Sequence, residues 1–209
     1  MTPDPILKIC GTTRLVDALH AVKEGATALG FVFWTNSPRA IAPADAKSII
    51  AALPPKVMPV GVFVNEAPGT LREVLKLTGV RAVQLHGDET LADFEFIECP
   101  LLKSATLDGL AQTARAWPAE TMLLLDAADR VKRGGTGVVV DWEKAATAAR
   151  SHKVVLAGGL TPLNVEEAIR TVRPIGVDVA SGVESSPGVK DFAKVSAFLT
   201  NARRAFAAL

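Results

Sequence analysis

The feature that most constrains this chain is a regular alternation of short apolar runs with longer amphipathic stretches. Several of the runs are apolar over five or more consecutive residues, a pattern typical of strands that are buried on both faces in a helix-covered parallel sheet. The eight runs are PILKIC (5–10), ATALGFVF (26–33), VMPVGVFV (57–64), RAVQLH (81–86), PLLKSA (100–105), TMLLLD (121–126), KVVLAG (153–158) and GVDVA (176–180).

The stretches between the runs carry helix signals. Residues 13–24 place Leu15, Leu19 and Val22 at helical spacing and are followed by Gly25, a good helix stop. Further helices are expected from Pro43, over 71–78, and over 141–150, where Asp141 is the capping residue. Two more are expected from Thr161-Pro162 and from about Val189 to near the last residue. Weaker candidates lie at 89–97 and 107–116.

Eight strands that alternate with about eight helices imply a parallel sheet with right-handed crossovers. Eight strands close the (β/α)₈ barrel, and 209 residues is near the lower size limit for a complete one. The alternative is an open doubly wound sheet. Against it, the first strand-to-helix turn reads CGTTR (10–14), which lacks the G-x-G-x-x-G of dinucleotide-binding folds. With no Pro-, Gly- or Ser-rich linker, we predict one α/β domain, a (β/α)₈ TIM barrel, over residues 1–209.

Composition excludes several classes of protein. Hydrophobic residues make up 49% of the chain, too many for a mainly disordered protein, and the net charge of +1 indicates no nucleic-acid or membrane partner. The first ten residues are too polar for a signal peptide, and no apolar run reaches the roughly 18 residues of a membrane span. We therefore expect a cytoplasmic protein with Cys10 and Cys99 as thiols. The cysteines and histidines show no metal-site spacing.

Polar residues at the ends of the runs are the candidate site residues, because barrel enzymes place their active site at the carboxyl ends of the strands. Cys10 ends the first run, and Arg39 lies in the loop after the second. His86 and Asp126 end the fourth and sixth runs, and Asp178 lies in the eighth. These side chains are expected to converge on one mouth although they are far apart in sequence.

A phosphate site is predicted from the last two strands. Gly158-Gly159 precede a helix that is expected to open at Thr161, and Ser181-Gly182 follow the eighth run. Loops after strands 7 and 8 form the recurrent phosphate site of this fold, where glycine lets backbone N–H groups approach the anion. Either pair alone would be explained as a tight turn, whereas both in this order favour a phosphate.

Each polar candidate also has a structural interpretation. The residues do not decide whether Cys10 is a small buried hydrophobe or an exposed thiolate near a helix N-terminus. Position favours Asp126 as a general acid over a structural carboxylate, and Arg39 suits a fork for a substrate carboxylate. Packing is a slightly better explanation for His86 than catalysis, and Asp178 suits either ribose-hydroxyl binding or strand-end structure.

The motifs together resemble the phosphoribosylanthranilate isomerase family over nearly the whole chain, in the right order. The combination of the first and last motifs is highly specific. The matching segments are KICGTT (8–13), ALGFVFWTNSPRAI (28–41), VGVFVN (60–65), VQLHGDE (83–89), LLLDA (123–127), GGTG (134–137), LAGGLTPLNVEEAI (156–169) and DVASGVESSPGVKD (178–191).

The resemblance implies a (β/α)₈ barrel without metal or organic cofactor, which converts N-(5-phosphoribosyl)anthranilate to its 1-deoxyribulose 5-phosphate isomer. It implies Cys10 as general base, Asp126 as general acid and Arg39 as the binder of the anthranilate carboxylate. It further implies that the loops at Gly158-Gly159 and Ser181-Gly182 hold the phosphate. The expected partner is a small phosphorylated substrate, and the protein is expected to be a monomer or a homodimer.

Two alternatives remain beside this interpretation. One is another phosphosugar barrel enzyme: an epimerase, an indole-glycerol-phosphate synthase-like enzyme or a related histidine-pathway isomerase. Epimerases of this kind would need paired aspartates and metal-binding histidines, a set that this chain lacks. The synthase needs catalytic lysines at strand ends; Lys8 and Lys103 lie within the first and fifth strands, so composition alone does not exclude it. The other is a non-catalytic barrel that binds a phosphorylated ligand. Ala180, where the family more often has serine, is a small departure that would preserve a backbone donor.

Overall fold

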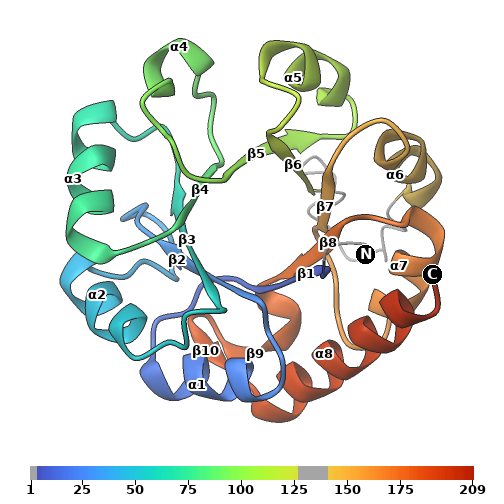
Figure 1. Ribbon diagram of the computed structural model, residues 1–209. Helices are drawn as coiled ribbons and strands as arrows, with labels where there is room; N and C mark the ends of the chain where they lie inside the picture. The colour runs from blue at the N-terminus through green and yellow to red at the C-terminus, as the bar shows by residue number, and fades with distance from the viewer. Residues whose placement is uncertain (1–3, 127–140) are drawn as a thin grey trace.

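The computed structural model describes residues 4–126 and 141–209, and in it the eight expected strands close into one barrel (Figure 1). Each strand pairs in parallel with the next, and β8 pairs back onto β1, with Lys8 beside Asp178. The strands are Ile6–Ile9 (β1), Ala28–Val32 (β2), Met58–Phe63 (β3), Ala82–Leu85 (β4), Leu101–Thr106 (β5), Met122–Asp126 (β6), Val154–Ala157 (β7) and Gly176–Val179 (β8). The predicted TIM-barrel fold is confirmed.

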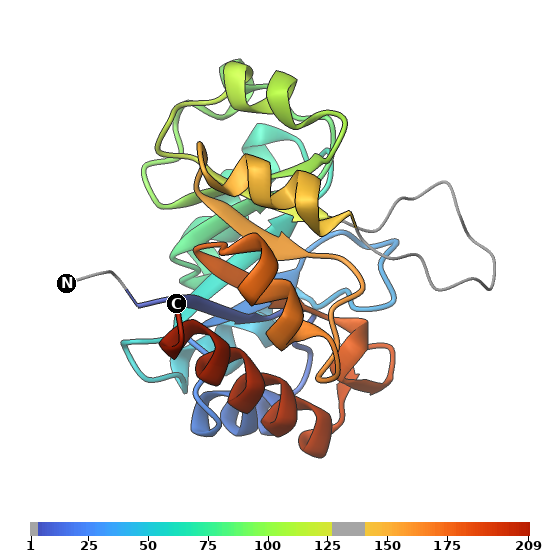
Figure 2. The same ribbon diagram turned by 90° about the vertical axis from the view of Figure 1, so that its right-hand side faces the viewer.

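Eight helices of the described residues surround the strands, and Figure 2 shows this outer layer from the side. They form near the expected positions, although the two weaker candidates are shorter than their stretches. The helices are Leu15–Lys23 (α1), Pro43–Ala51 (α2), Pro68–Thr78 (α3), Leu91–Phe94 (α4), Leu110–Ala116 (α5), Trp142–Ala149 (α6), Val165–Val172 (α7) and Phe192–Ala207 (α8). None of them is long and apolar enough to cross a membrane.

Two helix starts differ from expectation. Helix α7 begins at Val165 rather than at Thr161, because Asn164 closes a turn just before the helix. The Asn164 side chain accepts from the N–H of Thr161 and donates to the carbonyl of Gly159. Helix α8 begins at Phe192 rather than near Val189. A 3₁₀ turn and a small hairpin come before it, at Ser181–Val183 (η1), Glu184–Ser186 (β9) and Val189–Lys190 (β10).

Helix α1 buries a different face from the one that its apolar spacing suggests. Leu15 and Leu19 are 43% and 44% exposed, whereas Ala18 and Ala21 are fully buried. Small side chains bring the helix close to the barrel. Asp17 is drawn into the same buried face, because its carboxylate accepts from the backbone N–H of Lys190.

The core has the layers expected of a closed barrel. Most of the buried apolar side chains lie between the strands and the outer helices. A second cluster includes one residue each from β2 to β6 and two from β7: Ala28, Val60, Ala82, Leu102, Leu124, Val155 and Ala157. A third, small cluster joins Cys10 to Val32 and Val62, with Ala180 packed against it, near the carboxyl ends of their strands.

Candidate active site

A cavity of about 1050 Å³ lies at the carboxyl ends of the strands. This volume is at the upper end of the range for small-molecule sites. All nine residues predicted from the sequence line it: Cys10, Arg39, His86, Asp126, Gly158, Gly159, Asp178, Ser181 and Gly182. The fold therefore brings them to one place, and their individual roles stay predictions.

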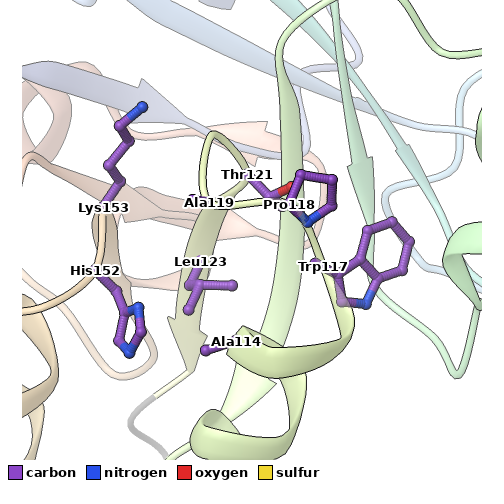
Figure 3. Close-up of a pocket in the computed structure, with 8 residues that line it drawn as sticks. All are labelled: Ala114, Trp117, Pro118, Ala119, Thr121, Leu123, His152 and Lys153. Carbon is purple, nitrogen blue, oxygen red and sulfur yellow. The ribbon is translucent and has the colours of Figure 1, made fainter.

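A second, much smaller cavity lies at the other end of the barrel (Figure 3). Its lining combines Ala114 of α5 and Leu123 of β6 with Trp117, His152 and three further residues of the connections, and Lys153 just before β7. Its volume of about 20 Å³ has room for about one water molecule. Of these two cavities of the described residues, the one at the mouth is large enough for a phosphorylated sugar derivative and the smaller one is not.

Cys10 directly follows β1 and lies at the base of the mouth. It is 8% exposed, so the thiol is buried rather than exposed at a helix N-terminus, and α1 begins only at Leu15. Burial raises the pKa of the Cys10 thiol, and the positive charge of Lys8 opposes this.

Asp178 forms a buried ion pair with Lys8 of β1. The Lys8 Nζ lies 2.9 Å from Asp178 Oδ1, and the Lys8 side chain is fully buried. A charge buried in a strand needs such a partner, because desolvation would otherwise cost several kcal/mol. Of the two interpretations left open for Asp178, the ion pair supplies a structural function, and the carboxylate still lines the cavity.

Arg39 lies against Glu184 rather than standing alone over the mouth. Its Nε and Nη2 donate to both carboxylate oxygens, with the closest contact at 2.7 Å, and Lys190 contacts the same carboxylate at 2.9 Å. Burial alone would raise the pKa of Glu184, but the hydrogen bonds from Arg39 and Lys190 outweigh it and hold that pKa below its ordinary value. The pairing fixes one edge of the guanidinium and leaves Nη1 outside these bonds.

His86 follows β4 and is held by neighbours on two strands. Its Nδ1 interacts with the Gln84 amide at 3.1 Å and with the Ser104 hydroxyl. Beside it, Lys103 forms a buried 2.8 Å ion pair with Glu89. These contacts support the packing interpretation of His86, although its ring also lines the cavity.

Asp126 is the last residue of β6, next to Thr106 of β5 and Ala157 of β7. It is half-buried and lines the cavity from a different side than Cys10, because β6 and β1 are separated by β7 and β8 in the closed barrel. The GGTG motif at 134–137 lies outside the described residues.

The two glycine loops meet at the mouth. Gly158 and Gly159 both have positive φ, 78° and 65°, which favours glycine. A methyl group on Gly182 would come within 1.9 Å of the Leu160 carbonyl oxygen, so the loop after β8 packs directly on the loop after β7. The backbone of both loops can therefore approach one ligand closely.

Sequence reasoning gave no role to several charged residues of the mouth. Lys8 and Lys103 lie inside apolar runs, where a charge signals a buried partner. Asp178 lies 170 positions from Lys8 and Glu89 lies 14 positions from Lys103, so neither partner is marked by a local pattern. The residues missed are Lys8, Lys103, Glu89, Glu184 and Lys190.

A closed eight-stranded parallel barrel with thiol, carboxylate and glycine loops around one mouth defines the class of TIM-barrel enzymes that act on small molecules. No group of three or more potential metal ligands occurs among the described residues. The chain belongs to the N-(5'-phosphoribosyl)anthranilate (PRA) isomerase family, whose model matches residues 7–201. This confirms the resemblance seen in the motifs.

Relatives of known sequence and structure agree. The chain is 47% identical to N-(5'-phosphoribosyl)anthranilate isomerase of Pseudomonas fluorescens (strain Pf0-1), over 94% of this chain and 97% of that protein. The crystal structure of the Thermotoga maritima isomerase superposes with a TM-score of 0.88 at 40% identity, over 95% and 98% of the two chains. A phosphoribosylanthranilate isomerase in complex with reduced 1-(o-carboxyphenylamino)-1-deoxyribulose 5-phosphate has a TM-score of 0.84 at 39% identity, over 95% and 98%.

Proposed function

We propose that the chain converts N-(5-phosphoribosyl)anthranilate to 1-(2-carboxyphenylamino)-1-deoxyribulose 5-phosphate, an Amadori rearrangement in tryptophan biosynthesis. Membership of the isomerase family supports this, as does the reduced product analogue bound to a structural relative. The observation that carries the assignment of residues is that Cys10, Asp126 and both glycine loops line one cavity. The proposed state of assembly is a monomer or a homodimer.

The first step opens the sugar ring. Asp126 gives its proton to the furanose ring oxygen, the bond from that oxygen to C1′ breaks, and the electron pair stays on oxygen. The nitrogen lone pair forms a C=N double bond, which gives a protonated Schiff base. A carboxylic acid within reach of the leaving oxygen typically contributes a 10²–10⁴-fold acceleration.

The second step moves a proton from carbon. The Schiff base cation acidifies the C2′ proton, and the Cys10 thiolate removes it. The released electron pair forms a C1′=C2′ double bond, which gives an enolamine that tautomerises to the ketone. Because Cys10 and Asp126 project from β1 and β6, base and acid approach the sugar from different sides of the mouth.

Binding is divided between the two ends of the substrate. The loops at Gly158-Gly159 and Ser181-Gly182 hold the phosphate through backbone N–H groups. Arg39 holds the anthranilate carboxylate through the part of its guanidinium that Glu184 leaves unused. Asp178 and His86 complete the wall around the ribose.

The test follows the loss of freshly made phosphoribosylanthranilate by its fluorescence. Cys10→Ser and Asp126→Asn should each fold normally, bind the open-chain product almost as well as wild type, and lose at least about 10²-fold in turnover. Open-chain product already has its ring open, so binding it needs no proton transfer.

Cys99→Ser is the matched control, since Cys99 lies before β5 and outside the cavity lining, and it should keep its turnover. Normal turnover by Cys10→Ser would remove the thiol from the mechanism, and normal turnover by Asp126→Asn would assign ring opening to another group. A wild-type protein that binds product without turnover would be a binding protein, and turnover of a different phosphosugar alone would make it another barrel enzyme.

A further inference from the structure

Lys8, two positions before Cys10 in the chain, is the charged residue with the largest effect on the Cys10 thiol. Alternate residues of a strand point to the same side, so Lys8 and Cys10 both point into the barrel. Lys8 is fully buried, and the mechanism above gives it no part. Its ion pair with Asp178 satisfies one of the three donors of its ammonium group.

Gly30 of β2 makes this approach possible. A methyl group on Gly30 would come within 2.7 Å of Cys10 Sγ and 3.0 Å of Lys8 Nζ, so the two side chains meet over its bare backbone. Gly30 is not among the glycines with positive φ, and the position therefore requires glycine for space rather than for backbone conformation.

The charges around the thiol leave a positive excess. A set of five described charged residues acts on Cys10 or pairs with residues that do: Lys8 of β1, Asp178 of β8, Lys190 of β10, Arg39 after β2 and Glu184 of β9. It contains three cations and two carboxylates. A thiolate at Cys10 would make it neutral. Asp126 and His86 are the other titratable predicted site residues that line the same cavity.

We propose that Lys8 is a positioning residue that holds the Cys10 sulfur in place and supplies the counter-charge for its thiolate, while Asp178 limits how much of that charge the thiolate receives. This inference rests on the proposed role of Cys10 as base. It gives the buried Lys8–Asp178 pair a purpose beyond strand packing: the ammonium group is shared between the Asp178 carboxylate and the Cys10 thiolate that acts as the base.

The electrostatics of both partners agree with this arrangement. Burial raises the pKa of Cys10, the charge of Lys8 lowers it, and the charge of Asp178 raises it. Burial alone would lower the pKa of Lys8, but Asp178 and Cys10 outweigh this, so Lys8 stays charged. Lys8 and Asp178 therefore act on the pKa of the thiol with opposite signs.

The test measures the pH dependence of Cys10 alkylation by iodoacetamide, in a Cys99→Ser background, by mass spectrometry. Only the thiolate attacks, forming an S–C bond and releasing iodide. Lys8→Met should raise the pH midpoint by about one unit or more, about tenfold less thiolate at a given pH. Asp178→Asn should lower the midpoint, because Lys8 then faces the thiolate alone.

Lys153→Met is the matched control, since Lys153 is exposed at the opposite end of the barrel, beside the small cavity (Figure 3). It should leave the midpoint unchanged. The acid limb of kcat/KM should move in the same direction as the alkylation midpoint in each variant. Unchanged midpoints, or midpoints that move in the same direction in Lys8→Met and Asp178→Asn, would overturn the proposal.

Two outcomes keep the inference separate from the proposed function. If Lys8→Met does not fold, Asp178→Asn still decides, because an unchanged or raised midpoint in that variant contradicts the shared ammonium group. If Cys10→Ser keeps full turnover, the role of Cys10 as base fails, whereas the alkylation midpoints still report whether Lys8 supports a thiolate.

Discussion

Single residues at the mouth are organised by pairs of opposite charge. Lys8 with Asp178 and Arg39 with Glu184 join residues far apart in the chain, and Lys103 with Glu89 joins the strand β5 to the loop after β4. Breaking a buried pair by removing one partner typically costs 3–5 kcal/mol, because the other charge stays buried and unpaired. Replacing one partner therefore changes both the local stability and the position of the side chains that the pair contacts.

Arg39 has two expected roles, binding of the substrate carboxylate and pairing with Glu184, and a substitution can distinguish them. Arg39→Ala should weaken binding of a product analogue that carries the anthranilate carboxylate by about 1.5–3 kcal/mol, the usual range for a hydrogen bond to a charged group. An analogue without the carboxylate should bind the variant and wild type alike. Titration calorimetry with both analogues measures this.

Glu184→Gln is the control for this prediction, because it removes the charge that Arg39 pairs with and keeps the arginine. We expect it to retain the preference for the carboxylated analogue. If both analogues lose the same affinity in Arg39→Ala, the arginine acts only through its bond to Glu184.

At the scale of elements, the site depends on how two loops pack together. The loop after β7 is braced by Asn164, whose side chain contacts Thr161 and Gly159. The 3₁₀ turn η1 after β8 rests on the Leu160 carbonyl through Gly182. A phosphate held between backbone N–H groups of both loops would require this contact to be preserved.

Gly182→Ala should therefore weaken phosphate binding. Its methyl group would meet the Leu160 carbonyl oxygen at 1.9 Å, so one of the two loops must move. We expect KM for the phosphorylated substrate to rise by about tenfold or more, with kcat less affected, since a shift that removes one charged hydrogen bond costs about 1.5–3 kcal/mol.

Gly69→Ala is the matched control, because a methyl group there meets nothing within 4 Å and the residue lies in helix α3. It should leave KM unchanged and stability equal or slightly higher. An unchanged KM in Gly182→Ala would mean that the loop after β8 does not take part in phosphate binding.

At the scale of the whole molecule, the first and last units of the chain are tied together. Besides the β1–β8 pairing, Arg39 after β2 binds Glu184 of β9. Lys190 also donates from Nζ to the Cys10 carbonyl and from its backbone N–H to Asp17 of α1. Closing a barrel joins residues at opposite ends of the sequence, and these contacts add charged links at the closure.

Acid should weaken this closure through Glu184. Its pKa is held below its ordinary value of 4.5, so its contribution to stability is complete above that pH and is lost as the pH falls through the lower, folded-state value. Glu184→Gln should therefore be less stable than wild type at pH 7, with a difference that shrinks below about pH 4.5. Urea unfolding of both proteins between pH 7 and pH 3 checks this, and a constant difference would contradict it.

The sequence alone determined the barrel, because buried parallel strands require continuous apolar runs and the eight runs count the strands directly. It also determined which residues reach the mouth, since a strand's carboxyl end is a local feature: Cys10, Asp126 and the glycine pairs were all found that way. Helix capping was equally local, as at Asp141, whose side chain accepts from the N–H of Lys144.

The tertiary structure decided what surrounds those residues. The burial of Cys10, the pairing of Arg39 with Glu184 145 positions away, and the meeting of Lys8 with Asp178 depend on barrel closure, which no local pattern records. Helix α1 buries Ala18 and Ala21 because close packing favours small side chains, whereas apolar spacing pointed to Leu15 and Leu19. Charges and contacts across the barrel are long-range in sequence, so only the folded chain brings them together.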